Sequence, residues 1–168
     1  MKLKLIAITI FAFSLSACAK NLPIVQSPSP SPQDQNVNWQ AGFAIVTNGT
    51  FRAFTAPMYH NLASDVYLES SNPNIVHVKK TGVTWTNFFE TMPFKLTSEC
   101  LTTGTKETFC TGPKGTLKFY LNSQKVADLL NHEIKDGDKA LVTFGNETED
   151  QIKSQLDQVG NPKNQKVQ

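Results

Sequence analysis

Residues 1–36 of this 168-residue chain are not expected to enter a packed core, which leaves room for a single domain. Lys2 and Lys4 precede an apolar run from Leu5 to Leu15, which is the pattern of a secretory signal. A helix of that length, at about 1.5 Å per residue, is too short for a bilayer core of about 30 Å. About 125 residues remain, which is enough for one hydrophobic core but not for two.

A proline-rich segment follows the signal. Residues 18–36 contain Ser-Pro three times between Ser27 and Pro32 and have no aromatic side chain. Such a segment favours extended polyproline II structure at about 3.1 Å per residue, so it predicts a semi-rigid tether with a reach of roughly 55 Å. We expect one folded domain over residues 37–160 and a flexible polar tail over residues 161–168.

The junction between signal and tether reads Leu15-Ser16-Ala17-Cys18, which resembles the lipobox of bacterial lipoproteins. The resemblance implies that residues 1–17 are a signal peptide and that the sulfur of Cys18 carries a diacylglycerol, with a further acyl chain such as palmitate on the new amino group. Several acyl chains anchor a protein to a bilayer stably, whereas one does so only marginally. The alternative is an ordinary cleavage site beside a free thiol.

The lipobox resemblance also predicts a location. A chain acylated at Cys18 is anchored in the bacterial cell envelope, with the lipid bilayer as its first partner. The next residue is Ala19, where lipoproteins kept at the inner membrane carry aspartate. In a host with two membranes, the resemblance therefore implies the outer membrane, facing the periplasm or the surface.

The charge of the chain argues against nucleic acid as a partner. The whole chain has 16 Lys and Arg against 14 Asp and Glu, and loss of Lys2 and Lys4 with the signal makes the mature chain neutral. Nucleic acid is bound through clustered cationic side chains, and there is no basic excess to supply them. At 39% hydrophobic residues, the chain is also too apolar for extensive disorder.

The first half of the domain predicts two β-hairpins and a helix. Asn48-Gly49 interrupts the strand-like segment 39–55, and this dipeptide suits a hairpin turn because both positions need positive φ. A second hairpin is expected from segments 66–68 and 75–78. Thr84 can then cap a helix over residues 85–92, whose apolar side chains recur at helical spacing and predict core packing.

The second half of the domain predicts strands and a C-terminal helix. The helix is expected to begin at a cap on Asn146 and to end at Gly160, with Ile152, Leu156 and Val159 on one side. The other expected elements are strands at 94–97, 117–121 and 140–144, with a short helical turn at 126–130.

The order of elements from Asp65 to Gly145 resembles the β-grasp, or ubiquitin-like, arrangement, in which a mixed sheet wraps one helix. The resemblance rests on the helix after the second strand, the strand "LKFYLN" and the turn Asp136-Gly137-Asp138. It implies an α+β fold with an extra N-terminal β-hairpin and a C-terminal helix. The stretch "GVTWTNFFETM" and the paired cysteines also resemble a set of small uncharacterised exported proteins of bacteria and archaea, which implies no particular activity.

Cys100 and Cys110 are the two cysteines that remain once Cys18 is lipidated, and export places them in an oxidising compartment. We therefore predict a structural disulfide, which could stabilise the fold by roughly 3 kcal/mol on the chain-entropy model. The alternative is a redox pair. Such pairs usually have the spacing Cys-X-X-Cys, which this pair lacks.

His60 and His77 support a second hypothesis, a metal-binding lipoprotein that holds copper or zinc. With His132 they are scattered along the chain, whereas metal sites that can be read from sequence have closely spaced ligands. His77 alternates with Val76 and Val78, so it is expected to face away from the core as a surface histidine. In the similar exported proteins, His-X-His patterns occupy the second hairpin, and this chain departs from that pattern.

The segment Met58, Tyr59 and His60 is the loop best suited to bind a partner, because its side chains are unusual for so short a loop. The first hypothesis is a membrane-anchored binding module, without a cofactor, that contacts an envelope protein or polysaccharide, because the tether gives the domain reach to a partner away from its own anchor. The candidate contacts are this loop and any sheet edge that the first hairpin leaves open. The sequence has no nucleophile elbow, phosphate loop or dinucleotide-binding turn. A third hypothesis, an envelope redox protein or hydrolase, would need an active site built from scattered residues.

Overall fold

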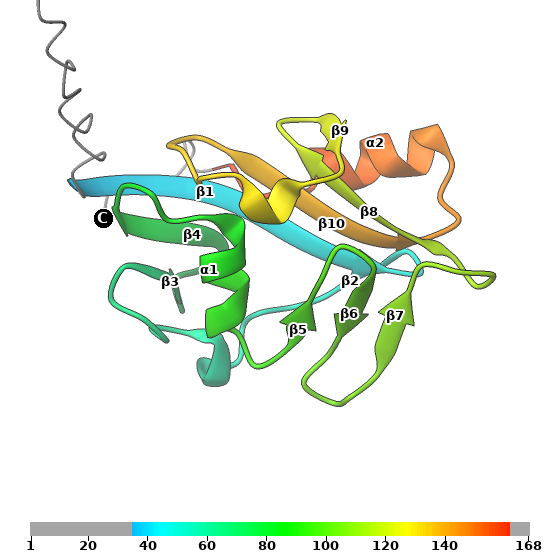
Figure 1. Ribbon diagram of the computed structural model, residues 1–168, viewed down its shortest axis with the longest axis horizontal. Coiled ribbons are helices and arrows are strands. Elements are labelled where there is room, and N and C mark those ends of the chain that lie inside the picture. The colour runs from blue at the N-terminus through cyan, green and yellow to red at the C-terminus, as the bar shows by residue number, and fades with distance from the viewer. Residues whose placement is uncertain (1–34, 162–168) are drawn as a thin grey trace, which may run out of the picture. The chain divides into compact units, whose positions relative to one another are not determined.

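The computed structural model describes residues 35–161 (Figure 1), so Cys18, the signal, nearly all of the tether and the tail from residue 162 lie outside the described residues. Within residues 35–161 the fold is a mixture of β-sheet and helix, as the sequence predicts, and strands predominate. No helix in this part of the chain is long and apolar enough to cross a membrane.

The main sheet has two parallel strands at its centre, β1 and β10, and antiparallel pairs on both sides (Figure 1). A two-residue strand, β2 (Thr50–Phe51), pairs with the end of β1. In spatial order the other strands are β3 (Val66–Glu69), β4 (Asn72–Lys80), β1 (Asn36–Thr47), β10 (Lys139–Gly145), β8 (Thr116–Leu121) and β9 (Gln124–Val126).

The remaining elements lie between and after these strands. A small antiparallel sheet forms between the first helix and β8, and single-turn 3-10 helices follow β2 and β9. These elements are η1 (Pro57–Tyr59), α1 (Trp85–Thr91), β5 (Lys95–Leu96), β6 (Cys100–Thr102), β7 (Thr108–Cys110), η2 (Leu129–Asn131) and α2 (Glu149–Asp157).

The N-terminal hairpin has a different place in the fold from the one that the sequence predicts, which is an addition outside the main sheet. Its turn is confirmed, with positive φ at Asn48 and Gly49. However, β1 is no appendage: it is a central strand, paired with β10 on one side and β4 on the other. Residues 41–47 are all buried, which is what a strand covered on both faces requires.

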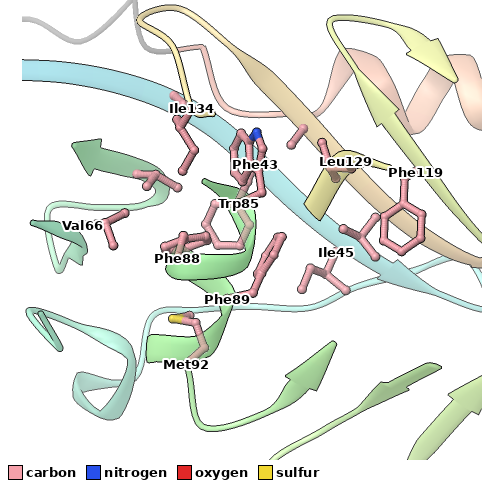
Figure 2. Packing of buried hydrophobic residues seen from close by; sticks show 14 of the residues in the cluster. Phe43, Ile45, Val66, Trp85, Phe88, Phe89, Met92, Phe119, Leu129 and Ile134 are labelled. Atoms are coloured by element: carbon pink, nitrogen blue, oxygen red, sulfur yellow. The ribbon is translucent and has the colours of Figure 1, made fainter. Parts of the chain in front are cut away.

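Helix α1 forms where the sequence predicts it. The Thr84 side chain accepts a hydrogen bond from the Asn87 backbone amide, and the Asn87 side chain accepts one from the Thr84 amide. This reciprocal cap satisfies two amides that the first turn would leave unpaired. Trp85, Phe88 and Phe89 are buried against the sheet (Figure 2).

The start of α2 differs from the prediction by two residues. The cap is Thr148 rather than Asn146, because the Thr148 hydroxyl accepts from the Gln151 amide and the Gln151 side chain accepts from the Thr148 amide. Glu147 precedes the helix and turns inward to Lys118 of β8. That contact joins positions far apart in sequence, so local spacing could not indicate it.

The two faces of the main sheet have separate apolar clusters. On one face, Phe43 and Ile45 of β1 belong to the large core that includes α1 (Figure 2). On the other face, Ala44 and Val46 pack with Leu156 of α2 and with Val159, which follows the helix. The alternation of side chains along β1 therefore assigns α1 and α2 to opposite faces of the sheet.

Candidate functional site

An apolar cleft of about 440 Å³ lies between the segment that follows β2 and the small sheet β5-β6-β7. Phe54 and Tyr59 line it from the first segment, and Leu101 of β6 and Phe94, which directly precedes β5, line it from the other side. Met58 also lines the cleft and is 55% exposed, whereas Phe54 is 4% exposed. The cleft thus combines a buried aromatic wall with a flexible, accessible thioether.

A network around His60 fixes the conformation of the loop that carries Met58. The His60 Nε2 atom lies 2.8 Å from the carbonyl oxygen of Phe54, and the His60 backbone amide donates to the Pro57 carbonyl. A carbonyl oxygen only accepts, so Nε2 carries the proton and is not available as a metal ligand in this arrangement. The Tyr59 ring packs edge-on against Phe54 at 5.2 Å. His60 therefore positions the loop rather than lining the cleft.

His77 faces away from Val76 and Val78, as predicted, but the expectation that it lies on the surface is wrong. The residue is 8% exposed because the Tyr67 ring of the edge strand β3 stacks on it, with ring centroids 5.3 Å apart. Its Nε2 atom lies 3.8 Å from a carboxylate oxygen of Glu69. Burial lowers the pKa of His77, and the nearby Glu69 carboxylate opposes that shift.

The structure gives His60 and His77 separate sets of partners. His60 bonds to Phe54, and His77 contacts Tyr67 and Glu69 on β3. His132 pairs with Asp128, at 3.0 Å. Within residues 35–161, no group of three or more His, Cys, Asp or Glu side chains is arranged to hold a metal ion. Copper or zinc binding by these histidines stays a prediction.

The predicted disulfide is confirmed. Cys100 of β6 and Cys110 of β7 face each other across the strand pair and are bonded, with Cα atoms 4.1 Å apart. The bond therefore cross-links the two strands of the small sheet. Leu101, which follows Cys100, lines the apolar cleft, so the disulfide supports one wall of that cleft.

Arg52 joins the two sides of the cleft, and sequence reasoning did not identify it. Its Nε donates to the Thr47 hydroxyl at 2.7 Å, and its guanidinium pairs with Glu107 at 3.2 Å. The guanidinium also lies over the Phe109 ring, 5.1 Å from the centroid. Arg52 approaches residues 107–109 only in the folded chain. The local sequence around Arg52 does not indicate this contact, and neither does the local sequence around residues 107–109.

Comparisons with protein-family models, with curated proteins and with solved structures find no match for this chain. We therefore infer the function from the geometry of the described residues. Its main features are the apolar cleft, the exposed Met58 beside it and the disulfide that supports its wall.

Proposed function

We propose that this chain is a lipid-anchored lipoprotein of the bacterial cell envelope whose domain binds another envelope protein through the apolar cleft. The anchor rests on the lipobox resemblance at Cys18, and the tether over residues 18–36 would hold the domain away from the lipid surface. The observation that carries the binding proposal is the exposure of Met58 at the cleft.

The chemistry of the cleft favours an apolar contact. Met58 and Leu62 are large hydrophobic side chains that are 55% and 42% exposed, and both belong to the segment that follows β2. Exposed apolar groups beside a cleft are typical of interaction sites, and methionine adapts readily to the shape of a partner. A cleft of about 440 Å³ is large enough to take apolar side chains of a partner protein.

The arrangement of strands supports a finer fold assignment, a variant of the β-grasp. The sheet is mixed, with β1 and β10 parallel at its centre, and α1 follows the hairpin β3-β4 and packs on one face. In this proposal the sheet β5-β6-β7 is an insertion between the helix and β8. That insertion supplies one wall of the cleft, so it would be the functional addition to the common fold.

Replacing Cys18 by alanine tests the anchor. In cells supplied with labelled palmitate, the unaltered protein is expected to incorporate label and to fractionate with membranes, because its acyl chains insert into the bilayer. The Cys18→Ala protein is expected to carry no label and to accumulate as the uncleaved precursor. The double variant Cys100→Ala/Cys110→Ala should still be labelled. An unlabelled wild-type protein would remove the lipoprotein proposal.

Replacing Met58 by glutamate tests the cleft. A charge at this position would have to be desolvated on contact with an apolar partner, so co-purification of envelope neighbours is expected to fall at least about tenfold. A photo-crosslinking residue at position 58 should give one discrete adduct in cells. The matched control is Gln124 on β9, an exposed position outside the cleft. Glutamate at position 124 should leave the recovery of envelope neighbours unchanged, and a photo-crosslinking residue there should give no discrete adduct. Equal recovery of neighbours by Met58→Glu and the wild type would contradict the proposal.

A further inference from the structure

The backbone of β2 and of the residues that follow it has one side without a neighbouring strand. Val46 and Phe51 lie opposite each other in the β1-β2 pair. The next residue, Arg52, donates its amide to the Ile45 carbonyl at 2.8 Å. In an antiparallel pair, residues that bond to the partner strand alternate with residues whose N–H and C=O groups point the other way. The N–H and C=O of Phe51 therefore point away from β1.

Ala53 lies two residues further on, the spacing at which an extended backbone presents its N–H and C=O to the same side again. The pairing register continues this far, because the Phe54 ring packs at 4.9 Å on Phe43, the residue that the register places opposite it. Within residues 35–161, β2 pairs with β1 alone, and no other segment hydrogen-bonds to the backbone of Phe51 or Ala53. We call these outward backbone groups of Phe51 and Ala53 the open edge.

The apolar cleft lies along the open edge. Phe51 and Ala53 line the cleft, and so do Arg52 and Phe54, whose side chains belong to the other face of the segment. Consecutive residues of an extended segment line one cavity where the cavity meets the edge of the segment rather than one of its faces. Ala53 is exposed, so the edge is accessible from the cleft.

The two outer strands of the main sheet are better protected than the open edge. At β3, the Asn61 amide covers the strand by donating to the Leu68 carbonyl at 2.9 Å. At the other side of the sheet, β9 is only three residues long and has Lys125 at its middle. Covered, short or charged edges resist pairing with another chain. The open edge lacks these features and lies beside an apolar cleft, which favours the addition of a strand.

Charge in the cleft favours an uncharged segment as the added strand. Among the described lining residues, Arg52 is the one with a charged side chain. Its guanidinium is already paired with Glu107 at 3.2 Å. A segment beside the open edge would therefore meet no unpaired charge, and it would meet the apolar side chains of Phe54, Met58 and Leu101. Every second side chain of a strand points to the same face, so apolar side chains at alternate positions suit this cleft.

We propose that the partner of the apolar cleft contributes an extended, uncharged segment that adds to the open edge as a further strand, with alternate apolar side chains in the cleft. The backbone of Phe51 and Ala53 supplies the hydrogen bonds, and the cleft selects the side chains. This inference rests on the proposed function of the cleft and specifies the form in which the protein partner is bound.

The test uses a synthetic peptide, capped at both ends, in which valine and threonine alternate between single terminal lysines that keep it soluble. The full lipid-anchored chain in lipid nanodiscs is titrated with this peptide and followed by its backbone amide resonances. The amides of Phe51 and Ala53 are expected to exchange with solvent at least about tenfold more slowly in the complex, because each becomes a donor to the added strand. A matched peptide, N-methylated on two adjacent central residues whose amides point to opposite edges, should bind at least about tenfold more weakly.

Replacing Ala53 by proline tests the same edge from the side of the protein. Proline removes one outward N–H and places a ring on the open edge, so peptide binding should weaken at least about tenfold and recovery of envelope neighbours should fall. Ala56→Pro is the matched control and should bind like the wild type, because Ala56 lies outside the cleft and its φ of -73° already suits proline. Thermal unfolding shows whether each variant folds, and the two peptides give the same comparison on the unaltered chain if Ala53→Pro does not.

Equal binding of the two peptides to the wild type, or no binding of either up to about 5 mM, would overturn the proposal. So would full recovery of neighbours by folded Ala53→Pro where Met58→Glu loses them, and the apolar contact would then stand without an added strand. Full recovery by both variants would remove the proposed function of the cleft, and this inference with it.

Discussion

Replacing Phe88 by alanine is expected to lower the free energy of unfolding of the domain by about 3–5 kcal/mol. Phe88 is fully buried between α1 and the main sheet (Figure 2). Its ring lies edge-on to Phe43 of β1 at 5.1 Å and 5.0 Å from Phe89. Alanine would leave a cavity at the centre of this aromatic cluster, and the rigid rings around it could not close the space. The loss is a large share of the about 5–15 kcal/mol that stabilises an ordinary domain.

Urea unfolding followed by tryptophan fluorescence measures this loss, since Trp85 lies in the same cluster, 6.1 Å from Phe88. Glu90→Ala, on the exposed side of the same helix, is the matched control and should change the stability by less than about 0.5 kcal/mol. Phe88→Leu should fall between the two and keep the protein folded if the alanine variant does not. A loss below about 1 kcal/mol for Phe88→Ala would contradict the packing described for α1.

The sequence predicts those parts of the fold that depend on neighbours along the chain. Helix α1 could be predicted because its cap and its apolar spacing both lie within residues 84–92. The Asn48-Gly49 turn could be predicted because both residues must adopt positive φ. The central place of β1 could not, since strand order depends on contacts with β10 and β4, about 100 and 35 residues away.

The candidate sites divide in the same way. The disulfide between Cys100 and Cys110 was predicted from the number of cysteines together with the predicted export of the chain, and both of these come from the sequence. The alternation of side chains along the strand predicts that His77 points away from the core. It does not predict that His77 is buried, because the burial depends on Tyr67 of the neighbouring strand. The apolar cleft is built from two segments, and the sequence indicates only the loop with Met58, because the packing of that loop against the small sheet depends on the tertiary fold.

Replacing Lys118 by methionine is expected to destabilise the domain by about 3–5 kcal/mol at pH 7. The Lys118 ammonium donates to Glu147 at 2.6 Å and to the Gly145 carbonyl at 2.8 Å, and the two side chains are only 12% and 5% exposed. Methionine preserves the packing of the stem but leaves the Glu147 carboxylate buried without its counter-charge. Lys135→Met removes an exposed pair with Glu133 and is the matched control, with an expected loss below about 1 kcal/mol.

The pH dependence of this effect identifies the charge as its cause. Burial opposes ionisation of Glu147, but the hydrogen bonds from Lys118, from its own backbone amide and from Thr143 outweigh it and lower its pKa. A depressed pKa means that the wild-type pair contributes stability above the ordinary glutamate pKa of about 4.3 and loses it as the pH falls through the lower folded-state value.

In Lys118→Met the main contact that lowers the pKa of Glu147 is gone, so the buried carboxyl is expected to become neutral at a higher pH, which relieves the penalty of burying a charge. Urea unfolding at pH 7 and pH 4 should therefore show the difference between the two proteins shrinking towards acid. The double variant Lys118→Met/Glu147→Gln should be more stable than Lys118→Met at pH 7, and a gap that is independent of pH would assign the loss to packing instead.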